Sequence, residues 1–115
     1  MRSAVREVNL EHGMPTVEQA LRRLTGELYT TRRMGCAVLK LIHGYGSSGK
    51  GGKIRVAVRR ELEKQKSLNQ VKEVIPGEKF SIFESATLSA FSKAPELRRD
   101  RDLDRYNNGV TYVVL

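Results

Sequence analysis

Hydrophobic and polar residues alternate at the start of the chain and then change to a helical period. Residues 5–11 alternate, which predicts a first strand with one side facing a core. Thr16 and Gln19 stand three residues apart, as in a capping box, so a helix is expected to begin there and to end near Arg33. The apolar positions that repeat with a 3.6-residue period along this helix are Val17, Ala20, Leu21, Leu24 and Leu28.

The middle and the end of the chain continue the alternation of strands and helices. Residues 37–43 form a nearly continuous apolar run, which is typical of a strand covered by helices. A second amphipathic helix is expected after the following glycine-rich loop, up to about residue 66. Residues 71–75 and 109–115 predict two more strands. This order predicts the α/β fold class, with a sheet and helices packed on it.

The segment between the last two strands has a weaker pattern. Residues 76–108 are expected to form an insertion of irregular structure within a single domain of residues 1–115. Phe83, Leu88 and Phe91 have the spacing of a short helix. The mixed charge run at residues 98–105 predicts a solvated loop.

The composition narrows the classes of protein to consider. The chain has 115 residues, which is the size of one domain, and its single cysteine, Cys36, excludes an internal disulfide and fits a reducing compartment. No apolar stretch reaches about 18 residues, so no transmembrane helix is expected. The first residues do not form a secretory signal. We therefore expect a cytoplasmic protein without a membrane partner.

The positive charge is concentrated in one part of the sequence. The formal net charge is +8, yet residues 28–60 contain no Asp or Glu. Such a stretch predicts a nucleic-acid partner, because each neutralised phosphate releases counterions. A solvated basic face without a partner is the alternative. The basic residues of the stretch are Arg32, Arg33, Lys40, Lys50, Lys53, Arg55, Arg59 and Arg60.

The loop after the second strand carries the candidate chemistry. It precedes a helix, whose free N–H groups and positive dipole end favour an anion. Two nucleotide-binding patterns nearly match the loop and are set aside: a dinucleotide-binding fold needs a longer chain, and Gly51 stands where a P-loop has Ser or Thr. The residues expected to bind phosphate are Gly44, Tyr45, Gly46, Ser47, Ser48, Gly49, Lys50, Lys53 and Arg55.

Three motifs, in this order, resemble the small MutS-related (Smr) domain family. Residues 11–13, followed by residues 15–21, are similar to its first motif, an acidic-x-His-Gly strand end that leads into a helix. Residues 41–46, running into residues 53–55, resemble its His-Gly-x-Gly loop and the helix after it. Residues 109–114 are similar to its closing strand.

The resemblance covers nearly the whole chain apart from residues 76–108. It implies a two-layer β-α-β-α-β-β sandwich with a mixed four-stranded sheet and an insertion before the last strand. It also implies nucleic-acid binding, and many members of the family nick DNA or cleave RNA. The family has Asp two residues before the His of the first motif, where this chain has Leu10. The neighbouring Glu11 can replace that Asp only if the strand breaks or bulges before His12.

Two functions follow from these residues. As an endonuclease, the protein would use His12 or His43 as a general base, with Glu11 as the carboxylate of the first motif and the loop amides stabilising the phosphate. Because Leu10 replaces the acidic residue, the alternative is an inactive DNA- or RNA-binding module or an adaptor.

The roles of single residues stay open at this point. Both histidines also fit a structural role at a strand end. Tyr45 fits stacking on an unpaired base or packing on the nearby helix. We expect no metal site and no cofactor, since carboxylates near the loop are sparse. The sequence does not separate DNA from RNA and does not define the oligomeric state.

Overall fold

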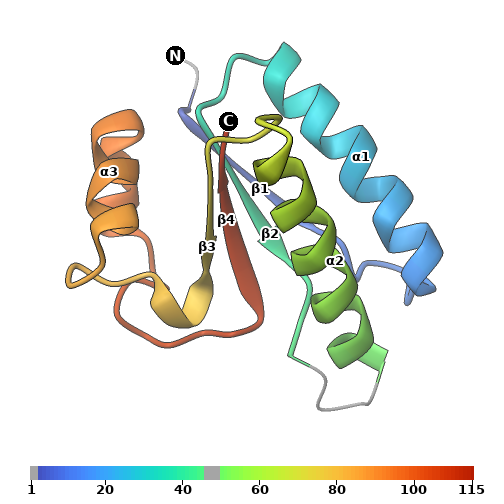
Figure 1. Cartoon of the computed structure of the whole chain (residues 1–115). Coiled ribbons are helices and arrows are strands. Elements are labelled where there is room, and N and C mark those ends of the chain that lie inside the picture. Colours follow the sequence, from blue (N-terminus) through green and yellow to red (C-terminus); the bar gives the residue numbers. More distant parts are fainter. Residues whose placement is uncertain (1–2, 46–49) are drawn as a thin grey trace.

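The computed structural model of the chain describes residues 3–45 and 50–115. The predicted strands and helices are present, including a short helix within residues 76–108 (Figure 1). In chain order the elements are β1 (Val5–Asn9), α1 (Val17–Arg33), β2 (Val38–Ile42), α2 (Lys50–Ser67), β3 (Glu73–Pro76), a 3₁₀ turn (Gly77–Lys79), α3 (Ser85–Lys93), a second 3₁₀ turn (Pro95–Arg99) and β4 (Val110–Val114).

The four strands form a mixed sheet in the order β1-β2-β4-β3. β1 is parallel to β2, whereas β4 is antiparallel to both of its neighbours. Ile42 pairs with Val110, and Pro76 pairs with Thr111. The ends of β2 and β3 and the start of β4 therefore meet at one edge of the sheet. The predicted mixed four-stranded sheet is confirmed.

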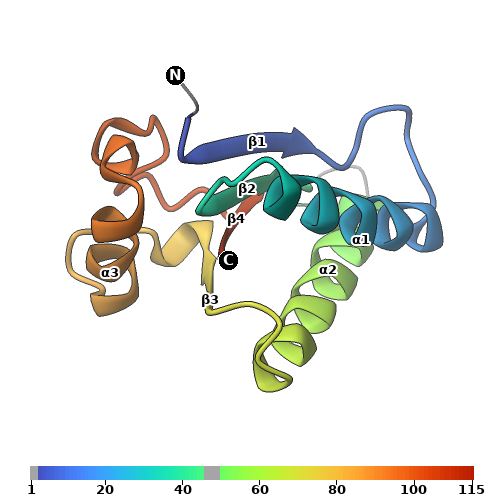
Figure 2. The ribbon, with the colours of Figure 1, turned by 90° about the horizontal axis from the view of Figure 1, so that it is seen from above.

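Helices α1 and α2 cover one face of the sheet (Figure 2). The predicted capping box is present, since Gln19 N–H donates to Thr16 Oγ1 over 3.1 Å and Thr16 N–H donates to Gln19 Oε1 over 2.9 Å. The apolar stripe of α1 packs with α2 and the sheet, and this core stabilises the fold mainly through the hydrophobic effect. Fully buried members of the core include Leu10, Leu24, Leu39, Leu41, Val58, Leu62 and Val113.

The segment from residue 76 to residue 108 covers part of the opposite face of the sheet. Phe80 stacks on Tyr112 with ring centroids 4.0 Å apart, and Phe91 meets Phe80 edge-on. The predicted short helix exists as α3, with Phe91 buried. Leu88 is exposed on this helix, and Phe83 precedes it with 88% of its surface exposed.

A buried ionic cluster attaches this segment to the sheet. Lys40 of β2 is only 2% exposed, and its Nζ lies 2.6 Å from Asp102 Oδ2 and 3.0 Å from Asp100 Oδ1. The Tyr112 hydroxyl donates to Asp100 Oδ1 over 2.8 Å, and Asn107 Nδ2 donates to Asp102 Oδ1 over 2.9 Å. Burial alone would raise the pKa of Asp102, but hydrogen bonds from Asn107 and Lys40 hold it below its usual value.

This cluster corrects the interpretation of the basic stretch as one surface. Lys40 is buried and paired with carboxylates, so it is not available to a ligand. Arg32 and Arg33 end α1, where Arg32 donates to the carbonyl of Gln70. The acid-free part of the sequence is therefore divided between the interior and separate places on the surface.

Replacing Lys40 is expected to destabilise the protein strongly. Lys40→Met keeps the length of the side chain but leaves Asp100 and Asp102 without their cation, which costs about 3–5 kcal/mol of the free energy of unfolding. Urea unfolding measures this loss. Lys64→Met, at an exposed position of α2, is the matched control and is expected to change the value by less than about 0.5 kcal/mol. Equal stabilities of the two variants would contradict the structural role of the cluster.

Candidate nucleic-acid interface

A buried histidine stands where β2 passes into the glycine-rich loop. His43 has no exposed surface, and its Nδ1 lies 2.8 Å from the carbonyl oxygen of Gly44. Because a carbonyl only accepts, Nδ1 carries the proton. Its Nε2 lies 2.8 Å from Thr111 Oγ1, which accepts from Arg59 Nε over 3.0 Å. Burial lowers the pKa of the ring and keeps the imidazole neutral, so Nε2 carries no proton and the Thr111 hydroxyl donates to it.

Arg59 connects this histidine to a carboxylate. Its two terminal nitrogens each lie 2.8 Å from one oxygen of Glu78, in the 3₁₀ turn after β3. One of them also donates to the carbonyl oxygen of Val110 over 3.2 Å. We call the hydrogen-bonded series Glu78, Arg59, Thr111 and His43 the polar chain. Because these contacts occupy Arg59, it is a structural residue of this edge.

Burial lowers the pKa of His43 to about 4; its hydrogen bond to Gly44 opposes the shift, and the charges of Arg59 and Arg55 add to it. At neutral pH the ring is uncharged, and its basic nitrogen is occupied by the Thr111 hydroxyl. This geometry favours a positioning role for His43. Its use as a general base stays a prediction.

The start of the loop is attached to β4 through the backbone. The amides of His43 and Gly44 both donate to the carbonyl oxygen of Gly109, each over 3.0 Å. Gly44 has φ +75°, and a Cβ there would lie 2.2 Å from Glu11 Oε1. Only glycine therefore allows the Glu11 carboxylate to lie against this loop. Tyr45 follows, 58% exposed, with its ring against Gly109.

The first motif lies in a turn next to this loop. β1 ends at Asn9, and Leu10 is completely buried in the core, so the acidic position of the family is apolar here. The strand thus breaks before His12, which meets the condition under which Glu11 can take that place. His12 itself is exposed. The structure brings Glu11 to Gly44 and leaves the His12 side chain facing solvent.

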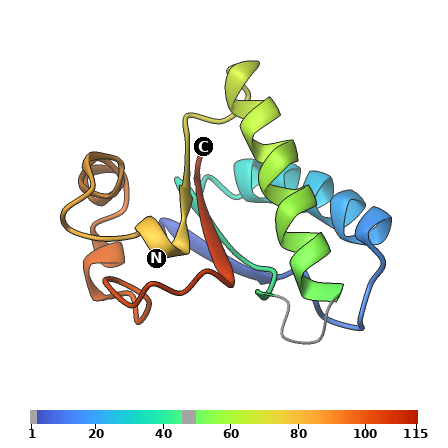
Figure 3. The same ribbon diagram turned by 60° about the horizontal axis from the view of Figure 1, so that its bottom comes forward.

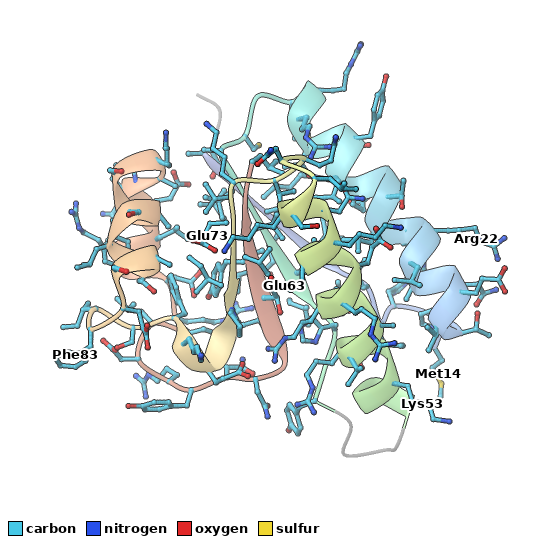
Figure 4. All side chains as sticks on the ribbon, viewed as in Figure 1. Met14, Arg22, Lys53, Glu63, Glu73 and Phe83 are labelled. Carbon is cyan, nitrogen blue, oxygen red and sulfur yellow. The ribbon has the colours of Figure 1, made fainter. Side chains whose placement is uncertain are left out.

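The first turns of α2 carry the exposed cations of this region. A groove of about 590 Å³ is lined by Arg55, Arg60 and Asn108, together with Val56, Arg59, Glu63 and Glu78. A second groove of about 520 Å³ shares Val56 and Arg60 with it and reaches Lys53. Figure 4 shows Lys53 near the start of α2, and Figure 3 shows that α2 starts at the edge of the molecule where β2 ends. We call the combined surface the α2 groove.

Some predicted phosphate ligands lie outside the described residues. These are Gly46, Ser47, Ser48 and Gly49, and the side chain of Lys50 is also not described. Of the others, Gly44 and Tyr45 lie at the start of the loop, and Lys53 and Arg55 lie along the α2 groove. Sequence reasoning missed Thr111, Glu78 and Asn108. A threonine within the apolar run of the last strand was the one available signal for a buried polar group.

The neutral buried His43 makes the stability depend on pH. The unfolded chain protonates this residue near pH 6.5, the folded chain only near pH 4. The resulting stabilisation is fully present above pH 6.5 and is lost as the pH falls towards 4, by on the order of 3 kcal/mol. Urea unfolding of wild type and His43→Gln between these pH values measures it. The variant is expected to lack this part of the pH dependence, and identical profiles would contradict the assignment.

Comparisons with known proteins agree with the motifs and the fold. The family model described as "Smr domain" matches residues 10–88, which is well over half of the chain. The Smr domain of Thermus thermophilus MutS2 has a similar structure, with a TM-score of 0.59 and 24% sequence identity over 96% of each chain. No protein of curated function matches in sequence. Within the described residues, no helix has the length and apolar character to span a membrane, and no group of three or more His, Cys, Asp or Glu side chains is placed to hold a metal. The chain belongs to the Smr domain family.

Proposed function

We propose that this Smr domain binds nucleic acid along the α2 groove, with phosphates held by Lys53, Arg55 and Arg60. The observation that carries the proposal is the continuity of two grooves that share Arg60 and the half-exposed Val56. Cationic side chains around an apolar floor fit a sugar-phosphate backbone. Family membership supports the same class of partner.

The electrostatics of the groove favour an anion. The first turn of α2 has no acidic residue, so the positive end of the helix dipole is not neutralised there. Burial alone would raise the pKa of Glu78, but hydrogen bonds from Arg59 hold it below its usual value, so this carboxylate stays ionised and paired. Glu63 lies farther along α2, at the other end of the groove lining. Lys53, Arg55 and Arg60 therefore set the sign of the field near the loop.

Tyr45 extends this surface at the end of β2. Its ring is more than half exposed and is backed by Gly109, whose missing side chain leaves room for it. A base can stack on the free face of the ring. Because the polar chain and the Gly109 carbonyl hold the backbone beneath it, Tyr45 is presented from a fixed position.

Removing two groove cations is expected to weaken binding. Lys53→Gln with Arg60→Gln should lower the affinity for a labelled oligonucleotide about tenfold, because charge-assisted contacts are lost. The slope of log K against log salt should fall by roughly 1.4 for a single strand. Fluorescence anisotropy at several salt concentrations measures both quantities.

The matched control for this experiment removes the same charge elsewhere. Arg22 and Lys72 are exposed; Arg22 points away from the groove on the outer side of α1 (Figure 4), and Lys72 lies just before β3, beside the end of β4. Arg22→Gln with Lys72→Gln should leave the affinity and the salt slope nearly unchanged. Equal losses of affinity in both double variants would show that net charge alone attracts the nucleic acid, and would contradict binding along the α2 groove.

Phosphodiester cleavage is a second candidate, favoured by the Glu11 carboxylate lying against Gly44. A phosphate bound at the start of the loop would place its reacting atoms beside this carboxylate. Glu11 would accept the proton of the attacking hydroxyl or water, and the exposed His12 would donate one to the leaving oxygen. The amides of His43 and Gly44 already donate to Gly109, so the loop amides expected to stabilise the phosphate are those of residues 46–49, which lie outside the described residues.

Cleavage is expected to depend on the first motif while binding does not. Glu11→Gln and His12→Ala should each reduce cleavage of a labelled RNA roughly 100-fold, with affinity nearly unchanged. Glu18→Gln, at an exposed position in the first turn of α1, is the control and should cleave like wild type. Gel analysis with and without EDTA checks this. Cleavage that persists in both variants would rule out these roles.

A further inference from the structure

In the mixed charge run at residues 98–105, most acidic side chains point inward and the basic side chains point to solvent. Asp100 and Asp102 turn inward to Lys40, whereas Asp104 and the four arginines of the same run are exposed. The run therefore presents positive charge to solvent although its sequence is nearly balanced. We call residues 98–106 the arginine turn; its exposed basic residues are Arg98, Arg99, Arg101 and Arg105.

The four exposed arginines differ in the partners that they have among the described residues. Arg98 lies over the ring of Phe91 at 5.2 Å, and Arg101 lies 3.4 Å from Glu7 Oε1. By contrast, the side chains of Arg99 and Arg105 make no hydrogen bond or ion pair within residues 3–45 and 50–115. Their charge is available to a ligand.

The arginine turn also holds an aromatic ring in solvent. Tyr106 is 73% exposed, and it adopts a left-handed backbone with φ +56°. Asp104, with φ +59°, donates its amide to the carbonyl oxygen of Phe80 over 2.9 Å. The ion pairs of Lys40 with Asp100 and Asp102 hold the turn against the sheet. An apolar ring kept outside the core in a strained backbone is a candidate contact residue.

The turn leads directly to the proposed interface. Three residues after Tyr106, Gly109 lies against Tyr45 and Gly44. Figure 3 shows the segment before β4 running along the same lower edge at which β2 ends and α2 begins. A strand of nucleic acid on the α2 groove can therefore continue past Tyr45 onto the arginine turn.

We propose that the arginine turn is a second contact surface for single-stranded nucleic acid. Tyr106 stacks on an unpaired base, and Arg99 and Arg105 bind the adjoining phosphates. A base pair inside a duplex has no free face for the ring, so the ring selects unpaired bases. This inference rests on the proposed function and adds its substrate class. The family match ends at Leu88, so these residues belong to the part of this chain outside that match.

The test compares one strand in two forms. Fluorescence anisotropy measures binding of a labelled RNA of about 18 nucleotides, single-stranded and annealed to its complement, a length chosen to exceed one compact binding site. Tyr106→Ala should weaken single-strand binding about tenfold and leave duplex binding unchanged, whereas Tyr106→Phe should bind like wild type. Arg99→Gln with Arg105→Gln should lower the single-strand salt slope by roughly 1.4.

The outcomes separate this inference from the proposed function. Wild-type affinity in all turn variants, together with a loss in the Lys53 and Arg60 double variant, would overturn the second surface alone. Equal losses by Tyr106→Ala on single strand and duplex would overturn the stacking role. Absence of binding by the wild-type protein would overturn both proposals. Thermal unfolding of each variant, expected to match wild type because these side chains are exposed, excludes misfolding as the cause.

Discussion

The Thr111 hydroxyl is buried in the central strand pair and must find partners on both sides. It accepts from Arg59 and donates to His43, and Glu78 completes the series. Leaving the buried Thr111 hydroxyl or the buried His43 ring unpaired costs more than the bond itself contributes, because these groups cannot turn to water. The polar chain thereby ties α2, the turn after β3, β4 and the end of β2 to one edge of the sheet. The position of the loop and of Tyr45 depends on this constraint.

A second buried network decides which charges reach the surface. Lys40 neutralises two aspartates inside the arginine turn, and Arg59 neutralises Glu78 in the lining of the α2 groove. The charges of Lys40 and Arg59 are therefore neutralised within the protein. Lys53 and Arg60 of the α2 groove and Arg99 and Arg105 of the arginine turn remain available to a polyanion. The internal ion pairs thus shape the field that a polyanion meets.

Local patterns in the sequence predict the elements, whereas the site depends on pairings that no local pattern contains. The capping box at Thr16 and the alternation of strands and helices act over a few residues, and the structure confirms them. The roles of Lys40 and Thr111 depend on partners many positions away. The charge pattern therefore predicts that Lys40 belongs to a basic surface, whereas it is buried. The mixed charges of residues 98–105 predict a solvated loop, because alternating charge does not reveal which side chains turn inward. The Smr motifs located the loop correctly but did not show that His43 is buried.

The most direct test of this account is a map of the surface that nucleic acid touches. Amide chemical shifts of the isotope-labelled protein, followed during titration with a short single-stranded RNA, give that map for each residue. The account predicts changes at Tyr45, Lys53 and Gly109 and along the arginine turn, with none at the end of α1 around Arg32. Changes centred on the end of α1, with the α2 groove unaffected, would contradict it.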